Sequence, residues 1–389
     1  MFKKTLAAAA ILGAFAGSAF AADVTLYGVI DTGFSYMNKS VDGSDDVNTF
    51  QMKGGQQAGN RFGLKGTEDL GNGMKVGFVL ENGFDSDDGT FDSNGDNRIF
   101  GREALLFVRG AFGEVGMGRV GQLAGGAGSY ALFGSNMAPF STGWGNVGAS
   151  TNVLGACAAR FDNTVTYKTP TFAGLTVFAQ YSFDNDTTKE DLSGSKHGTE
   201  GKANVNRYYG MGAQYKAGGF EGVVIVDSIN YNSSERLASR YEDDSLSVTA
   251  GATYNFGVVK AYVNGQYFDN VASMGKSTKF SSRTDAAAGG FSKGIDGYGF
   301  NLGADVPAFG GTAKFIVGYG NGEIDLDNAD KPEVDMYQVG AGYIYPLSKR
   351  TSVWAAADFV SADYNKAALT DKVQDTEVTE FIFGMTHKF

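Results

Sequence analysis

Three short stretches of the chain carry residue types that could bind a nucleotide or a metal ion. Gly116, Gly118 and Gly121 match the spacing G-x-G-x-x-G. A dinucleotide site needs a helix after this motif and an acidic residue about 20 positions later, and the sequence shows neither. The stretch "NVASMGKST" (270–278) ends like a phosphate-binding loop, but Asn270 stands where that loop has its first glycine. Neither stretch predicts a nucleotide site.

The third stretch is the acidic segment "DSDDGTFDSNGDN" (85–97). Asp92, Asn94, Asp96 and Glu103 fall at positions 1, 3, 5 and 12 of a calcium-binding loop, but an asparagine stands where that loop turns at a glycine. The segment precedes a strand pattern and no helices flank it, so a solvated acidic loop is the favoured interpretation. Asp92, Asn94 and Asp96 remain a weak candidate for a metal site, and no cofactor is predicted.

Catalytic chemistry has little support in this composition. The chain has one cysteine, Cys157, two histidines, His197 and His387, and no G-x-S-x-G motif. A cysteine or serine nucleophile needs a base within reach, and neither histidine lies in a recognisable motif. Because a single cysteine forms no internal disulfide, Cys157 is interpreted as an incidental loop thiol. The sequence therefore predicts that the protein is not an enzyme.

The first 21 residues have the pattern of a secretory signal peptide. Two lysines precede an apolar run that ends in the small-residue pattern "AFA" at 19–21. We expect cleavage before Ala22, which leaves residues 22–389 as one domain, because no linker or charge block divides them. No later run is apolar over about 20 residues, so no transmembrane helix is expected. The 43 acidic and 32 basic residues disfavour nucleic acid as a partner.

Segments of about ten residues alternate apolar and polar side chains along the whole chain. In "VTLYGVIDTGFSY", for example, Leu26, Ile30 and Phe34 share one face while Asp31 lies on the other. The chain is rich in glycine (57 residues) and aromatic residues (13%) and contains only 5 prolines, a composition typical of strands and tight turns.

Two kinds of connection join these segments. Seven are short, and several carry the Gly or Pro of a tight turn. Eight are long and mostly polar: 37–59, 85–97, 121–160, 184–204, 231–243, 269–295, 321–333 and 363–377. Their alternation predicts an all-β fold, a 16-stranded antiparallel transmembrane β-barrel. Apolar strand faces and an export signal indicate an outer membrane, where barrel closure satisfies every backbone group.

Several motifs resemble those of the trimeric general diffusion porins of Gram-negative bacteria, especially beta-proteobacterial ones. They are "VTLYGVIDTGF", "NRFGLKGTEDLGNGMKVGFVLENGF", "FGREALLFVRGAFGEVGMGR", "DNTVTYKTPTFAGLTVFAQY" and the terminal "THKF". The resemblance implies a homotrimer of barrels whose third long loop folds inward and through which small hydrophilic solutes and ions diffuse. It also implies contact with outer-membrane lipid and lipopolysaccharide, and a C-terminal strand ending at Phe389 that the barrel-assembly machinery reads.

Strand parity predicts which charges line the lumen. In the hairpin that turns at "DLGNG", we expect Arg61 opposite Glu81, with Lys65 and Lys75 on the same inward face because the alternate residues are apolar. Further lumen candidates lie in other segments: Arg102 at a porin-like position, Arg160 where the third loop rejoins the wall, and Asp31 in the first strand.

The next hairpin, which turns at "RGAFGE", contains an apparent exception. Glu103 shares a face with Leu105 and Phe107, and Arg119 shares one with Met117. An arginine in contact with lipid at mid-membrane costs about 2–4 kcal/mol. We therefore expect Glu103 and Arg119 to lie close together on the outer surface, where the trimer interface covers them.

The third loop, 121–160, contains no aspartate or glutamate, so the wall arginines predict a weak to moderate anion preference. The alternative is that Glu81 and Asp31 neutralise Arg61 and leave selectivity flat. Two other functions stay open. Tyr130, Phe133, Phe140 and Trp144 of the third loop could build a substrate-specific site, or exposed loops could make the barrel an adhesin with incidental conductance.

Overall fold

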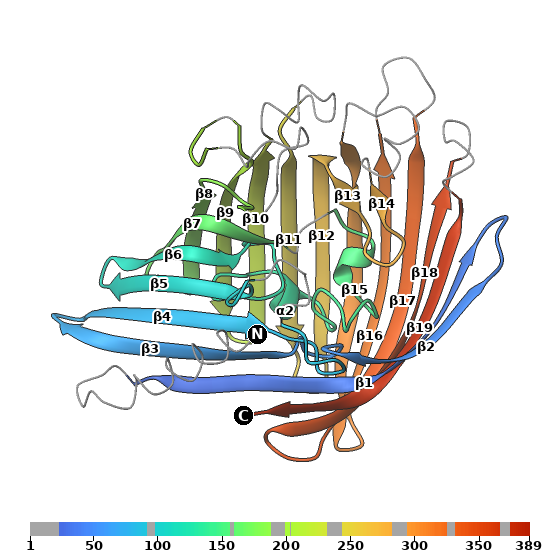
Figure 1. Ribbon diagram of the computed structural model, residues 1–389, viewed down its shortest axis with the longest axis horizontal. Helices are drawn as coiled ribbons and strands as arrows, with labels where there is room; N and C mark the ends of the chain where they lie inside the picture. The colour runs from blue at the N-terminus through green and yellow to red at the C-terminus, as the bar shows by residue number, and fades with distance from the viewer. Residues whose placement is uncertain are drawn as a thin grey trace, which may run out of the picture.

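The computed structural model describes residues 23–91, 98–155, 159–187, 199–202, 204–231, 243–281, 294–324, 331–365 and 374–389, apart from the side chain of Ser135. Seventeen strands form one continuous antiparallel sheet that curves around an inserted segment with a short helix, α2 (Figure 1). Among these residues, no helix is both long and apolar enough to cross a membrane.

The strands follow the alternating segments of the sequence. The first nine are β1 (Thr25–Val41), β2 (Val47–Gly54), β3 (Arg61–Gly71), β4 (Met74–Gly83), β5 (Glu103–Gly110), β6 (Gly113–Gly121), β7 (Arg160–Lys168), β8 (Leu175–Ser182) and β9 (Arg207–Ala217). The next six are β10 (Phe220–Asn230), β11 (Leu246–Asn255), β12 (Lys260–Val271), β13 (Ser273–Met274), β14 (Phe280–Ser281) and β15 (Ile295–Ala308). The last four are β16 (Gly311–Glu323), β17 (Glu333–Pro346), β18 (Thr351–Tyr364) and β19 (Thr376–Lys388).

Two of these strands share one position in the barrel wall. The half of β1 nearest the chain start pairs with β3, from Thr25↔Lys65 to Val29↔Arg61, and its far half pairs with β2. The segment 55–60 interrupts this wall position between β2 and β3. The seventeen strands therefore occupy sixteen positions, as the sequence predicts, and β13 and β14 form a separate small hairpin. Part of the predicted long loop 37–59 is thus strand.

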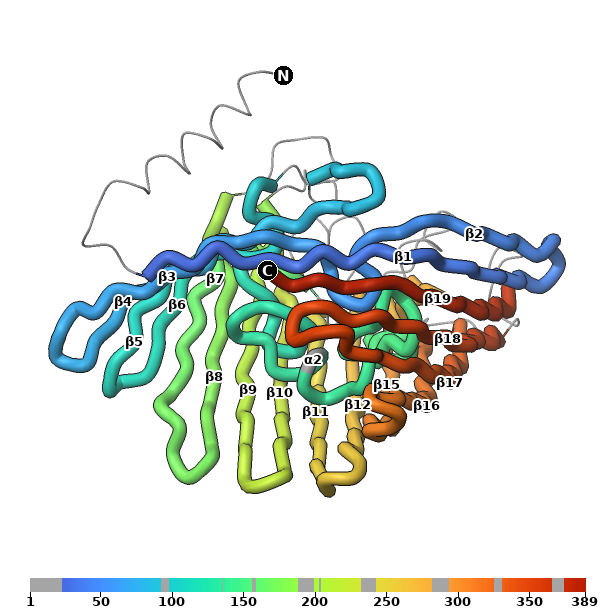
Figure 2. Tube along the Cα trace, turned by 90° about the horizontal axis from the view of Figure 1, so that it is seen from below, coloured from blue at the N-terminus to red at the C-terminus, as the bar shows by residue number. Residues whose placement is uncertain are grey.

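The barrel closes where the last strand meets the first. β19 pairs antiparallel with β1 from Val29↔Lys388 to Val41↔Thr376, and the two strands run side by side in Figure 2. Gly28 and Phe389 exchange two backbone hydrogen bonds of 3.1 Å. A Cβ on Gly28 would lie 2.2 Å from the Phe389 ring, so the ring covers this glycine. This pairing joins the first and last strands of the described sheet and so closes the barrel.

Alternation sorts the side chains onto the two faces of the wall. On β10, Val224 is 53% exposed on the outer face, whereas Val223 and Ile225 are buried on the inner face. The inner face is apolar here because a loop packs against it. That loop is the third long connection, which contains α2 (Gly134–Met137) and the 3-10 turn η2 (Ser150–Asn152).

Deletion of Phe389 should lower the thermal midpoint of the folded barrel. The deletion removes both hydrogen bonds to Gly28 and the ring that covers it, and each net hydrogen bond contributes about 0.5–1.5 kcal/mol. The midpoint is measured from the β-sheet circular dichroism signal on heating in detergent. Phe389→Ala, which keeps the backbone bonds, should fall between deletion and wild type. Equal midpoints for all three proteins would contradict this role in closure.

Candidate functional site

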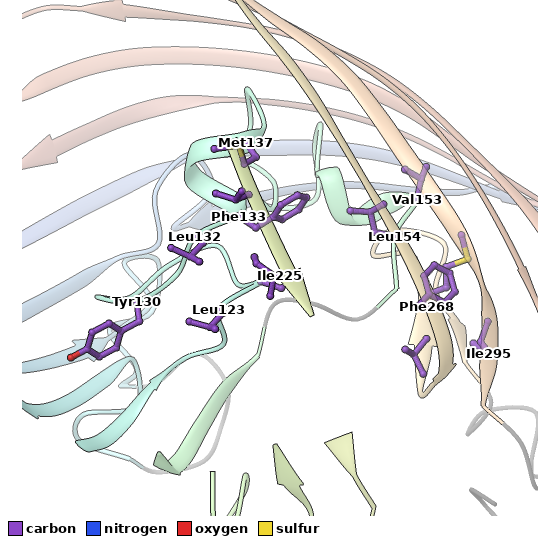
Figure 3. Packing of buried hydrophobic residues seen from close by; sticks show 14 of the residues in the cluster. Leu123, Tyr130, Leu132, Phe133, Met137, Val153, Leu154, Ile225, Phe268 and Ile295 are labelled. Carbon is purple, nitrogen blue, oxygen red and sulfur yellow. The ribbon is translucent and has the colours of Figure 1, made fainter. Parts of the chain in front are cut away.

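The third loop lies against the inner wall from one side of the barrel to the other. The Asn264 side chain on β12 donates to the carbonyl of Met137 (2.9 Å), and that of Asn301 on β15 donates to the carbonyl of Ser150 (3.0 Å). Figure 3 shows apolar side chains of the loop, among them Leu123 and Met137, gathered beside those of the wall strands. The insertion implied by the family resemblance is present.

Glycines in the wall make room for the loop backbone. Gly299 on β15 and Gly320 on β16 are paired neighbours, and the carbonyl oxygen of Val153 lies over both. A Cβ would approach this oxygen to 1.9 Å at Gly299 and to 2.2 Å at Gly320. At the loop tip, the amide of Gly148 donates to Asp358 on β18 (2.9 Å). The loop is therefore held by close backbone contact and by polar bonds.

Two arginines share one carboxylate on the part of the inner wall that the third loop leaves open. Arg102 Nε donates to Glu81 Oε1 (2.6 Å), Arg61 Nε lies 3.7 Å from Glu81 Oε2, and the Tyr27 hydroxyl donates to Oε2 (2.9 Å). All three charged side chains are partly exposed. Arg61 pairs with Gly83 and Gly63 is the residue opposite Glu81, so the register differs by two residues from the predicted pairing of Arg61 with Glu81.

Glu103 lies beside this group, and its predicted position was wrong. It pairs with Glu81 between β5 and β4, is buried, and accepts a hydrogen bond from the amide of Ser129 in the third loop (3.0 Å). Arg160 interacts electrostatically with both carboxylates and with Arg102. The structure thus brings three arginines and two glutamates together where the third loop leaves the wall.

Arg119 lies on the opposite face from Glu103. The register pairs Arg119 with Ala104, one position from the predicted partner, because the turn spans two residues between Gly110 and Gly113. The apolar residues beside Glu103 are covered from inside by the third loop, and Leu106 is the side chain exposed outside. The expected outward pair of Glu103 and Arg119 does not exist.

Arg119 instead belongs to an ion cluster that strand parity does not predict. Its Nη1 donates to Asp162 Oδ1 (2.7 Å), which also accepts from Arg98, and the amide of Thr187 donates to Oδ2 (2.9 Å). Arg98 also lies 3.3 Å from Asp186. The cluster ties the second and fourth long loops to the wall. No periodic pattern marks these loop residues, so only the tertiary structure reveals it.

Three other candidates do not join the arginine group. Asp31 is buried, accepts hydrogen bonds from the amides of Gln56 (2.7 Å) and Gln57, and so stabilises the segment 55–60 instead of neutralising Arg61. Lys75 lies at a short turn, 3.9 Å from Asp69, with both side chains exposed.

Lys65 is the third of these candidates and lies on β3 between Arg61 and the turn beside Lys75. Its Nζ lies 5.1 Å from the centre of the Tyr27 ring, and Tyr27 in turn donates its hydroxyl hydrogen bond to Glu81.

The aromatic residues of the third loop face the wall instead of the passage. Tyr130, Phe133, Phe140 and Trp144 are at most 4% exposed. Phe140 and Trp144 stack edge to face at 5.1 Å, and Trp144 meets Trp354 of β18 at 6.1 Å. They hold the loop in place, and they leave no aromatic surface for a sugar.

The remaining sequence candidates concern metal and thiol chemistry. Asp92, Asn94, Asp96 and Cys157 lie outside the described residues. Within the described part of the chain, no group of three or more His, Cys, Asp or Glu side chains is arranged to hold a metal ion.

Comparisons with known proteins agree with this architecture. A family model described as Gram-negative porin matches residues 7–387. An outer membrane porin protein of Bordetella pertussis is 31% identical and covers 100% of both chains. Outer membrane porin protein 32 of Delftia acidovorans is also 31% identical, over 95% of this chain and 91% of the relative. Among solved structures, an anion-selective porin from Comamonas acidovorans aligns at a TM-score of 0.64 and 23% identity, over 95% of this chain and 100% of that one.

Gly320→Ala should lower single-channel conductance. The new Cβ would displace the Val153 carbonyl and push the third loop away from the wall, which narrows the passage. Conductance is measured with purified protein in planar bilayers. Gly222→Ala on β10 is the control, because its Cβ would lie 3.0 Å from the movable Phe220 ring and 3.8 Å from the nearest backbone atom, an ordinary contact distance. A Gly320 variant that folds and conducts like wild type would contradict this packing of the loop.

Proposed function

The chain belongs to the Gram-negative porin family and is an outer-membrane porin, and we propose that its channel passes small hydrophilic solutes passively with a preference for anions. The observation that carries this proposal is the group of three arginines and two glutamates beside an uncharged third loop. The group has a formal excess of one positive charge at the level where the loop narrows the barrel.

Distance decides which charges act on a permeating ion. A unit charge about 5 Å from an ion interacts by about 3 kcal/mol at an effective dielectric constant near 20. Charges farther away than the Debye length, about 8 Å at physiological ionic strength, are largely screened. The chain as a whole has a formal net charge of −11, but this total includes charges at every distance from the ion, and only those within about a Debye length act on it strongly. The local arginines therefore dominate selectivity.

Glu81 moderates this preference without cancelling it. One carboxylate faces both Arg61 and Arg102, and Glu103 is turned toward the amide of Ser129. Asp31 is occupied by backbone amides, so it does not neutralise Arg61. These contacts support a moderate anion preference over flat selectivity. The burial of the aromatic residues of the third loop favours general diffusion over a substrate-specific site.

We also propose how the protein is exported and assembled and what surrounds it in the membrane. Residues 1–21 direct export and are removed, Phe389 ends the strand that the assembly machinery reads, and the finished channel works without cofactor or catalysis. Lipid and lipopolysaccharide surround its outer face. The exposed apolar side chains of the outer wall, such as Val224, Val263 and Phe300, suit this environment.

Three copies assemble through the outer face of the wall strands β3 to β6. On this face Leu106 and Met117 are about half exposed and offer an apolar surface. The segment after β4 folds back over the same face, where Phe91 meets Phe62 edge to face at 6.4 Å. The Arg98–Asp162–Arg119 cluster holds the neighbouring loops against the wall and so supports a stable contact surface.

Charge substitutions on the wall should move ion selectivity in opposite directions. Arg102→Gln should lower the chloride-to-potassium permeability ratio severalfold, because a unit charge near the passage is lost. Glu81→Gln should raise the ratio, because it frees both arginines. Reversal potentials in a KCl gradient measure the ratio. Lys75→Gln at the exposed turn is the control and should change it little. A cation preference of the wild-type channel would contradict the proposal.

Leu106→Gln should weaken the trimer, because it places an amide in the apolar contact surface. Val263→Gln on β12 is the matched control, since this side chain is equally exposed but lies on the opposite wall. Native mass spectrometry in a mild detergent should find three chains for wild type and for the control, and single chains for the Leu106 variant. A wild-type mass of one chain would overturn the assembly proposed here.

A further inference from the structure

The connection between β12 and β15 contains a hairpin that folds into the barrel. Its two short strands pair as Ser273↔Ser281 and Met274↔Phe280, and both apolar side chains are at most 1% exposed. The amide of Gly275 donates to the carbonyl of Leu154 in the third loop (3.0 Å). The hairpin is therefore bonded to the third loop.

The wall supports the hairpin from the other side. A Cβ on Gly320 or Gly322 of β16 would approach the Met274 side chain to 2.6–2.7 Å, so the methionine occupies the space that these glycines leave. Phe280 meets Tyr364 of β18 edge to face at 5.8 Å. The hairpin is thus built into the lumen beside the third loop.

Lys276 lies at the turn of this hairpin. Its Nζ donates to the carbonyls of Thr142 (2.9 Å) and Gly145 at the tip of the third loop, while the residue stays exposed to lumen water. An ammonium group has three donor protons, so one remains for water or a solute. No carboxylate of the described chain lies within 4 Å of Nζ.

We propose that hairpin β13–β14 is a second inserted segment of the channel and that Lys276 is an anion-contact residue at the tip of the third loop. This inference deepens the proposed function and depends on it. Small anions such as chloride, phosphate and carboxylates fit an ammonium group whose hydrogen-bond partners are uncharged carbonyls, because no carboxylate of the described chain forms an ion pair with it. The carbonyl bonds hold the ammonium in one place, so its charge acts at a defined point of the passage.

The surroundings of Lys276 make its charge sensitive to pH. The side chain is exposed to water on one side, but the protein atoms packed around its ammonium group reduce its hydration and, with Lys53 of β2 nearby, lower the pKa of Lys276 to about 8, while Glu380 of β19 and Asp358 of β18 act in the opposite direction. The ammonium is therefore charged below this pH and loses its charge as the pH rises through it. Anion preference should decline between about pH 7 and pH 9.

Three variants of the full chain in planar bilayers test the inference. Lys276→Gln should lower the chloride-to-potassium permeability ratio roughly threefold at pH 7, as expected for one charge beside a water-filled passage, and should remove its decline toward pH 9. Lys276→Arg keeps the charge throughout this range, so it should retain the preference and also lose the decline. Lys279→Gln, on the same hairpin, should behave like wild type.

Two results would overturn the inference: a Lys276→Gln channel with the wild-type ratio at pH 7, or a Lys276→Arg channel that keeps the wild-type decline. If the glutamine variant fails to fold, the pH dependence of wild type against Lys276→Arg still decides. A wild-type channel that prefers cations would instead contradict the proposed function. The comparison between variants would then still report whether Lys276 contributes to the chloride-to-potassium permeability ratio.

Discussion

Every backbone N–H and C=O group that crosses the membrane must find a partner inside the protein, because hydrocarbon offers none. A sheet satisfies this constraint only when its two edges meet, which is what β1 and β19 achieve through thirteen paired positions. Closure also creates the channel, since sixteen strand positions enclose a lumen wider than side chains alone can fill. The function therefore begins with a requirement of backbone hydrogen bonding.

A lumen of this width needs internal structure to discriminate among solutes. The third loop supplies it, but a polypeptide inside the barrel must also have its own backbone groups satisfied. Side chains of the wall do this: Asn264, Asn301 and Asp358 bond to loop carbonyls and an amide. Paired glycines such as Gly299 and Gly320 let the loop backbone approach the strands. One part of the inner wall thus fits the third loop, and another part carries charged side chains that face the passage.

Sequence patterns predicted the sixteen wall positions of the barrel and its closing strand, because alternation and turn residues are local signals. Strand register was harder. The turn has positive φ at both Asn72 and Gly73, and the observed pairing is centred one position later than predicted, which moves the partner of Arg61 from Glu81 to Gly83. The prediction that Glu103 lies on the outer face of the wall was wrong for another reason. Its neighbours Leu105 and Phe107 are apolar, and the sequence does not reveal that a loop, and not lipid, covers them.

Composition does not locate the residues that we propose to set selectivity. The formal charge of −11 describes the whole chain, whereas an ion in the passage responds to charges within a few ångströms. Lys276 stands in a stretch that resembles a phosphate-binding loop by chance, and the role proposed for it depends on a fold that turns a long connection inward. Where a charge lies relative to the third loop matters more than how many charges the chain has.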